Sequence, residues 1–418
     1  MNNYFSTHEI DFRRCHFKET VFCDISPHER CVVSNNRKID IRFGNAGIPV
    51  GELIFDISAG GKQSSRFSYV DSWVEHPDTF ALAPSMPLDG GPFFYTGDKT
   101  ALPAPIADAA PDSWGRKLLK ANLRCREQNE HLFVTELDYL VEPVDELRQG
   151  ALRFFDSETG LPMSQGTLAT VPNIKDAGRF TRASFAFQND PDAFKDNPDI
   201  EGLAHLVGSL GGARPKINVL GNDGSLWIAK LPRPDDTYDV AKVEGNTLRL
   251  AAMVGIKASE ASTVRIDGPH STLLVKRFDR IGNERVPYIS AQTFMGLSGA
   301  EAGNYVDLAM QIERYGAQPR QDIEELYRRL MFSVLVSNVD DHLRNHGFLM
   351  ETGGKWRLSP AFDINPSPGE GQTLKTAISD IHGNEPSIEA VVDAAPYFGI
   401  EVDVAAKMAK EMSDIVKC

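Results

Sequence analysis

The sequence has few cysteines, no long apolar run and no excess of positive charge, and each absence excludes a class of protein. It holds five cysteines and no C-x-x-C pair, so we expect no disulfide framework and a reducing compartment. No apolar run reaches the roughly 18 residues of a membrane helix. The first residues, Met1-Asn2-Asn3-Tyr4-Phe5, lack the basic and apolar blocks of a signal peptide. We therefore expect a cytoplasmic protein that does not bind membranes.

Positive charge is scarce over the whole chain. The formal net charge is −14 and the pI is near 5.2. An acidic chain repels the phosphate backbone of nucleic acids. The composition therefore predicts that the protein does not bind DNA broadly by itself, and it leaves open a local basic patch or a basic partner.

Three of the cysteines, Cys15, Cys23 and Cys31, lie near His16 and His28. A metal site can be imagined there, but the spacing of the cysteines matches no zinc signature. Ordinary buried or surface thiols are the simpler interpretation. We make no structural prediction for this N-terminal stretch.

The pattern of apolar residues changes along the chain from strand-like to helical. Alternation predicts a strand pair within 38–57, and three-residue and four-residue steps predict a buried helix face over 322–337. Further strands are predicted at 216–220, 226–231 and 271–278, and a further helix at 244–254. We predict an α+β protein with two lobes: a mixed, strand-rich lobe (1–278) and an all-helical lobe (279–418). A cleft between two such lobes is the plan of a protein kinase.

The strongest motif follows the predicted helix and reads Asn338-Val339-Asp340-Asp341-His342-Leu343-Arg344-Asn345. Asp340 and Asn345 have the spacing of the base Asp and the metal-holding Asn in a kinase catalytic loop. We predict that Asp340 accepts the proton of an attacking hydroxyl, and that Asn345 and the later Asp363 hold Mg²⁺ through hard oxygen ligands. His342 would brace the loop. Asp341 is interpreted as a structural or solvated carboxylate.

Lys230 ends a buried-looking strand, the place where a kinase holds the lysine that contacts the α- and β-phosphates. A helix carrying Glu244 follows within reach of an ion pair. The sequence thus predicts a Lys230–Glu244 pair, although Glu244 could instead be a surface carboxylate.

Two further segments complete the predicted nucleotide site. Gly211, Gly212 and Ala213 would let backbone N–H groups approach phosphate, with Lys216 adding charge; a simple helix C-cap is the alternative. The other segment, Val275-Lys276-Arg277-Phe278, would link the lobes. Backbone groups of Val275, Lys276 and Phe278 would bind the adenine edge, while Arg277 would pair with Asp279.

Taken together, these motifs resemble the HipA family of serine/threonine kinases, the toxins of HipA–HipB toxin–antitoxin pairs. The resemblance spans about 40–400, with an N-terminal subdomain at about 40–130 and a nucleotide-binding part at about 200–278. The matching segments are Gly211-Gly212-Ala213-Arg214-Pro215-Lys216, Ile228-Ala229-Lys230-Leu231-Pro232, Leu274-Val275-Lys276-Arg277-Phe278-Asp279-Arg280, the motif at 338–345, Leu358-Ser359-Pro360-Ala361-Phe362-Asp363 and, upstream, Asp108-Ala109-Ala110-Pro111-Asp112-Ser113-Trp114-Gly115.

The resemblance implies an ATP- and Mg²⁺-dependent serine/threonine protein kinase. Members of the family phosphorylate cytoplasmic targets of the translation machinery, such as an aminoacyl-tRNA synthetase. Many are neutralised by a small DNA-binding antitoxin of the HipB type. In some members a serine in the glycine-rich loop is autophosphorylated, which ejects the loop and switches the kinase off. Ser209 occupies that position here.

Other functions stay open at this point. Asp340, His342 and Asp363 could serve a metal-dependent phosphoesterase or nuclease, but such enzymes need more converging ligands and have no use for Lys230. The chain could be a HipA-like kinase of another substrate, including a small molecule. It could also be a pseudokinase in an antitoxin–DNA complex, although its catalytic residues are intact.

Overall fold

The structure is a computed structural model. It describes residues 36–97, 100–164, 171–195, 197–209, 211–266, 268–297, 303–351, 353–367, 369 and 372–417. Cys15, Cys23, Cys31, His16 and His28 lie outside this range, so the zinc interpretation is not tested. Within the described ranges, every helix is too short or too polar to span a membrane.

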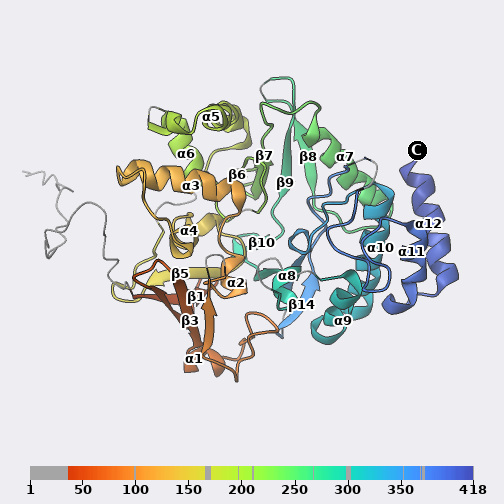
Figure 1. Cartoon of the computed structure of the whole chain (residues 1–418), viewed down its shortest axis with the longest axis horizontal. Coiled ribbons are helices and arrows are strands. Elements are labelled where there is room, and N and C mark those ends of the chain that lie inside the picture. Colours follow the sequence, from red (N-terminus) through yellow and green to blue (C-terminus); the bar gives the residue numbers. More distant parts are fainter. Residues whose placement is uncertain are drawn as a thin grey trace, which may run out of the picture.

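The N-terminal part is built on a five-stranded antiparallel sheet with strand order β4-β3-β2-β1-β5 (Figure 1). The predicted strand pair is confirmed: Ile39 and Ile41 alternate inward from β1, and Leu53 and Phe55 from β2. The strands are β1 (Arg37–Phe43), β2 (Ile48–Ile57), β3 (Gln63–Tyr69), β4 (Phe93–Thr96) and β5 (Leu152–Asp156), with the short helices α1 (Asp71–Val74) and α2 (Ala104–Ala107) beside them.

A helical layer connects this sheet to the next one. Its longest member, α3 (Ser113–Arg126), buries Trp114 and Leu118 in one core with residues of the following helices and strands. The remaining elements are α4 (Glu136–Val141), η1 (Asp145–Leu147), η3 (Ile174–Asp176), α5 (Ala177–Asn189), η4 (Pro191–Lys195) and α6 (Pro198–Leu206). This layer thus ties the N-terminal part to the strands that carry the predicted lysine.

Those strands form a second antiparallel sheet, in the order β6-β7-β9-β8. Lys230 lies at the end of β7, paired in register with Lys216 of β6 and Leu273 of β9. The elements are β6 (Lys216–Leu220), β7 (Leu226–Lys230), α7 (Val240–Met253), β8 (Ala261–Val264) and β9 (Thr272–Lys276). Helix α7 begins before the predicted 244–254 because the side chain of Asp239 caps it, accepting a hydrogen bond from the Lys242 N–H.

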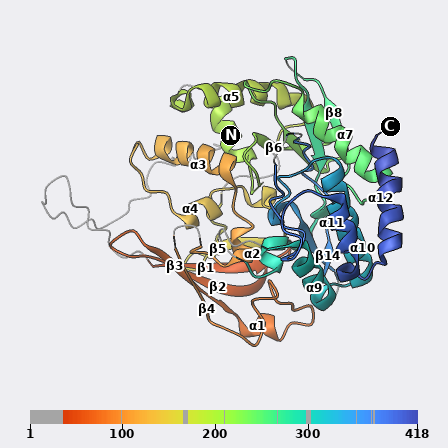
Figure 2. The same cartoon turned by 45° about the vertical axis from the view of Figure 1, so that its right-hand side comes forward.

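The C-terminal part is mainly helical, and its longer helices gather on the side away from the five-stranded sheet (Figures 1 and 2). The long helix α10 (Pro319–Leu335) buries Leu326 and Leu330, as the periodicity predicts. Its C-terminus leads into the loop 338–345. The other helices are α8 (Ala291–Phe294), α9 (Tyr305–Tyr315), η5 (Leu343–Asn345), α11 (Ile388–Asp393), η6 (Ala395–Phe398) and α12 (Val402–Val416).

One part of the fold prediction is wrong: the C-terminal lobe is not all-helical. It contains an antiparallel sheet of order β12-β13-β14 and a small β10–β11 ladder. Gly353 and Gly354, both at positive φ, turn the chain from β13 into β14. The strands are β10 (Arg280–Ile281), β11 (Glu284–Arg285), β12 (Tyr288–Ser290), β13 (Gly347–Glu351) and β14 (Lys355–Leu358). The α+β class itself is confirmed.

Candidate active site

A small cavity of about 100 Å³ lies where the second sheet meets the loops of the C-terminal part. Lys230 and Ile228 of β7 line it from one side, and Asn345 and Asp363 from the other. We call it the Lys230 cavity. It brings together residues that are far apart in the sequence and that the motif analysis placed in one nucleotide site.

Lys230 is the centre of an ion-pair cluster in this cavity. Its Nζ lies 2.5 Å from Glu244 Oε1 and 2.6 Å from Asp363 Oδ1. Glu244 is therefore no surface carboxylate: it is 2% exposed and lies behind the lysine on α7. Burial acts to lower the pKa of Lys230, but Asp363 and Glu244 outweigh it and hold that pKa above its ordinary value. The lysine stays charged.

The segment 211–216, called the glycine segment below, closes over the same cavity. Gly212 has φ +96°, a conformation that favours glycine. The Lys216 ammonium donates to the Gly211 carbonyl. Burial and then the like charge of Lys230 lower the pKa of Lys216 to about 8. A second cation thus faces the place where phosphates are predicted.

The adjacent carboxylates of the 338–345 loop have opposite environments. Asp340 is exposed and does not line the cavity. Asp341 is buried and accepts hydrogen bonds from Ser333 Oγ at 2.9 Å and from Tyr305 Oη, and its Oδ1 lies 3.1 Å from His346 Nε2. Of the two interpretations of Asp341, structural and solvated, the structural one is confirmed.

Asn345 and Asp363 each present an oxygen that fits a hard cation. The Asn345 amide donates from Nδ2 to the Asp340 carbonyl at 3.3 Å, which leaves its Oδ1 for another partner. Lys230 and Asn365 both donate to Asp363 Oδ1, which leaves Oδ2. Burial acts to raise the pKa of Asp363, yet Lys230 and Lys216 lower it well below its ordinary value. An anionic carboxylate and an amide oxygen suit Mg²⁺ with water and phosphate as further ligands.

The backbone of Asp363 is unusual for a residue with a side chain. Its φ is +57°, in the left-handed region that costs a non-glycine residue of order 1 kcal/mol. The neighbouring backbone is held from the loop at 338–345, because the Asn365 N–H donates to Asn338 Oδ1 at 3.0 Å. The fold therefore fixes Asp363 in a conformation that it would not adopt in isolation.

The segment predicted to link the lobes, 275–278, is called the hinge. It lines the cavity through Val275, Lys276 and Phe278. The Lys276 ammonium points elsewhere and pairs with Glu260 at 3.1 Å, so its backbone remains the part available to a ligand. Phe278 packs near Phe362, with ring centroids 5.5 Å apart. His342 also lines the cavity, with a buried Nδ1 that has no hydrogen-bond partner among the described residues.

One predicted binding residue is placed differently by the structure. Ala213 does not line the Lys230 cavity, because it lies exposed on the outer side of the glycine segment. Its carbonyl accepts a hydrogen bond from Arg233 Nη2 at 2.6 Å. The expectation that Ala213 contacts the ligand there is therefore corrected.

Sequence reasoning missed two kinds of site residue. Apolar walls come from Ile228, Tyr288 and Phe362, and no local motif distinguishes such residues from core. The other kind is Asp112 at the start of α3: its Oδ2 accepts from the Gly212 N–H at 3.1 Å and lies 3.6 Å from Arg344. No local pattern in the segment 108–115 gave a hint of this long-range contact.

The fold is similar to that of a solved structure. A chain from the Shewanella oneidensis complex of toxin–antitoxin proteins HipA and HipB with operator DNA superposes with a TM-score of 0.65 at 18% identity, covering 90% of this chain and 88% of that one. The match defines the class as an α+β fold shared with a chain of that complex, and in this chain Glu244 and Asp363 converge on Lys230.

The family follows from sequence profiles. The profile of the HipA-like C-terminal domain matches residues 208–418, half of the chain, and that of the HipA N-terminal domain matches 45–136. The chain belongs to the HipA family.

Curated relatives are more distant. "Putative kinase Y4dM" of Sinorhizobium fredii is 28% identical over 37% of this chain, and a "Putative kinase" of Haemophilus influenzae is 24% identical over 38%. The alignments span only 44% and 54% of those two proteins. "Putative kinase Y4mE" of S. fredii is 23% identical over 71% of both chains.

Proposed function

We propose that this protein is an ATP- and Mg²⁺-dependent serine/threonine protein kinase of the HipA type, acting in the cytoplasm. The observation that carries the proposal is the Lys230 cluster, in which one buried ammonium pairs with both Glu244 and Asp363. Phosphoryl transfer is catalysed mainly by positioning and by charge stabilisation. A charged lysine beside an anionic carboxylate supplies both positioning and charge stabilisation. This lysine stands at the end of a strand that also borders the hinge.

Each residue has one role in this proposal. Lys230 and Lys216 bind the phosphates, while Asn345 and Asp363 would hold Mg²⁺, which would supply positive charge beside the phosphoryl oxygens. Asp340 accepts the proton of the acceptor hydroxyl, and its exposure leaves room for a protein substrate. His342 braces the loop against the cavity.

A metal-dependent phosphoesterase is the weaker alternative. Such a site needs several carboxylates or histidines converging on the metal. No group of three or more His, Cys, Asp or Glu side chains arranged to hold a metal occurs in the described part of the chain. The two protein oxygens at Asn345 and Asp363 match the sparser kinase arrangement.

We further propose that Ser209 is the site of self-phosphorylation. Its hydroxyl accepts a hydrogen bond from the Gln149 N–H at 2.5 Å and it is 2% exposed, at the edge of the Lys230 cavity. A phosphate cannot fit in that position without displacement of the chain before the glycine segment. Phosphorylation there would therefore open the cavity and weaken nucleotide binding.

For partners, we propose a HipB-like DNA-binding antitoxin and a protein substrate of the translation machinery. The antitoxin proposal rests on the family membership and on the Shewanella complex, which holds HipA, HipB and operator DNA. The net charge of −14 favours contact with DNA through the antitoxin.

Calorimetric titration with ATP in the presence of Mg²⁺ tests the nucleotide site. We expect the wild type to bind and Asp363→Ala to lose at least about tenfold in affinity when Mg²⁺ is present. Without Mg²⁺ the two should differ less. Binding by Asp363→Ala that equals the wild type under both conditions would remove Asp363 from the metal site.

A further inference from the structure

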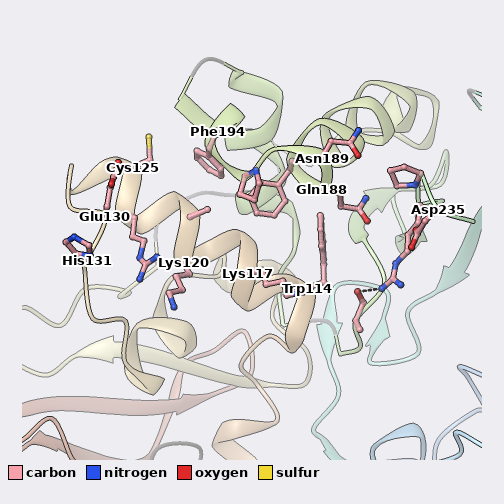
Figure 3. Close-up of a pocket in the computed structure, with 17 residues that line it drawn as sticks. Trp114, Lys117, Lys120, Cys125, Glu130, His131, Gln188, Asn189, Phe194 and Asp235 are labelled. Carbon is pink, nitrogen blue, oxygen red and sulfur yellow. Dashed lines mark hydrogen bonds between the residues drawn. The ribbon is translucent and has the colours of Figure 1, made fainter.

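A second and much larger hollow, of about 1050 Å³, lies on the outer side of the glycine segment. It is bordered by α3, the end of α5, η4 and the loop at 233–235 (Figure 3). We call it the α3 groove. The proposed phosphoryl transfer makes no use of it.

One side of the groove is apolar. Trp114, Phe187 and Phe194 line it, and each is at most 7% exposed. Trp114 packs on Phe187 edge to face, with centroids 5.6 Å apart. The indole Nε1 of Trp114 is buried and has no hydrogen-bond partner among the described residues. An unpaired buried donor costs free energy unless an occupant supplies an acceptor.

The other side of the groove is basic. Lys117, Lys120 and Arg124 recur along α3 at steps that keep them on one side of the helix, and Figure 3 shows the labelled Lys120 and Lys117 between Cys125 and Trp114. The two lysines are exposed and form no ion pair within the described ranges. In a chain of net charge −14, such a row of cations selects an anionic partner.

We propose that the α3 groove binds an extended acidic segment of another protein. Its carboxylates would pair with Lys117 and Lys120, and its backbone carbonyls would offer acceptors to the groove. A nucleic acid fits less well, because the aromatic rings are buried and leave no open face for stacked bases. Glu130 and Asp235 lie at the two ends of the groove (Figure 3).

The position of the groove places an occupant against the nucleotide site. Ala213 lines the α3 groove, whereas Gly211 and Gly212 line the Lys230 cavity. The backbone N–H of Trp114, as distinct from its indole N–H, also donates to the Gly212 carbonyl at 3.5 Å. A docked segment would therefore lie on the opposite side of the same short stretch of backbone.

The test measures binding and does not depend on kinase activity. The probe is a fluorescein-labelled peptide of alternating Glu and Gly, followed by fluorescence anisotropy with the full-length protein. We expect binding that the unlabelled peptide competes away and that an oligo-dT of equal charge does not. Cys125 lines the groove as a free thiol, so bound peptide should also slow its alkylation, read by peptide mass mapping.

A matched pair of double variants separates the groove from general surface charge. Lys117→Glu with Lys120→Glu should weaken peptide binding by about tenfold or more, since two attractions become repulsions. Lys407→Glu with Lys410→Glu, exposed on α12 with the same spacing, should leave it unchanged. Circular dichroism checks that both variants fold.

Three results would overturn the proposal. One is the absence of peptide binding by the wild type, and another is an equal loss in both double variants. The third is peptide binding that leaves the alkylation rate of Cys125 unchanged. Stronger competition by oligo-dT than by the acidic peptide would assign the groove to a nucleic acid instead.

Discussion

Asp340 and Asp341 show how much two adjacent residues can differ in role. Asp341 is buried against Tyr305, Ser333 and His346, whereas the Asp340 side chain is exposed. We predict that Asp341→Ala lowers the free energy of unfolding by about 3–5 kcal/mol, because it leaves buried donors without an acceptor. Asp340→Ala should change it by less than about 0.5 kcal/mol. Thermal unfolding of both variants checks this, and equal midpoints would contradict the assignment.

The protonation of Lys216 predicts how the affinity for ATP depends on pH. Its pKa in the free protein is about 8, where burial and Lys230 act against the charge and Asp363, Glu244 and Asp112 favour it. Below pH 8 Lys216 is already protonated, so ATP binds a cation. Above pH 8 binding must first take up a proton, so affinity should fall as pH rises.

Calorimetry in two buffers of different ionisation enthalpy measures that proton uptake directly. The uptake should appear above pH 8 and vanish in Lys216→Met. If proton uptake depends on pH in the same way in the wild type and in Lys216→Met, another group titrates.

For single residues, the sequence predicted which side chains share the site better than it predicted the contacts that each one makes. The kinase-like spacing placed Lys230, Glu244 and Asp363 in one site, and the structure brings these side chains into contact. It did not reveal that Asp112 bonds Gly212, because that contact joins residues a hundred positions apart and leaves no local pattern.

The glycine segment offers a prediction at the scale of an element. A Cβ on Gly212 would lie 2.6 Å from Lys216 Nζ, at φ +96°, whereas a Cβ on Gly211 would meet nothing closer than Asp112 Oδ2 at 3.8 Å. Gly212→Ala should therefore strain the backbone and displace the Lys216 ammonium, lowering ATP affinity by about tenfold. Gly211→Ala should have the smaller effect. Calorimetric titration of both variants with ATP tests this prediction. A larger loss of ATP affinity in Gly211→Ala than in Gly212→Ala would contradict the explanation.

The strands that the sequence did not predict in the C-terminal part are short. Strand β12 spans Tyr288–Ser290 and β14 spans Lys355–Leu358, too few residues for alternation to stand out. The helix α10 was predictable because its buried positions repeat over several turns. The 13-residue helix α5 (Ala177–Asn189) was not predicted either, so length alone does not decide which elements can be foreseen.

At the scale of the whole molecule, a buried charge cluster joins the N-terminal part to the hinge. Asp279 pairs with Arg277 and Arg280 at 2.7 Å each and accepts from the Gly150 N–H at 2.8 Å. The two guanidinium groups also donate to the Arg148 carbonyl. The predicted Arg277–Asp279 pair is confirmed. Together with Arg280 it holds the backbone at Arg148 and Gly150, which no sequence pattern connects to the hinge.

Asp279→Asn should destabilise the protein by about 3–5 kcal/mol, since it leaves two buried guanidinium groups without a counter-charge. Burial acts to raise the pKa of Asp279, but Arg277 and Arg280 hold it well below its ordinary value. Its contribution to stability is thus present above the ordinary pKa of Asp and is lost as pH falls below it.

Denaturant midpoints as a function of pH measure this contribution, with the exposed Asp414→Asn as the control. The gap between Asp279→Asn and the wild type should narrow in acid. A gap that stays constant with pH would mean that shape, and not charge, accounts for the loss.

The central claim is that Lys230, Asp340, Asn345 and Asp363 transfer a phosphoryl group. Its most direct test follows label from γ-phosphate-labelled ATP, with Mg²⁺, onto the phosphatase-treated protein itself and onto the proteins of a cell extract. The account predicts labelling by the wild type, with self-labelling mapped to Ser209, and none by Asp340→Asn, which should still bind ATP. Absence of label on every acceptor in the wild type, or equal labelling by Asp340→Asn, would contradict it.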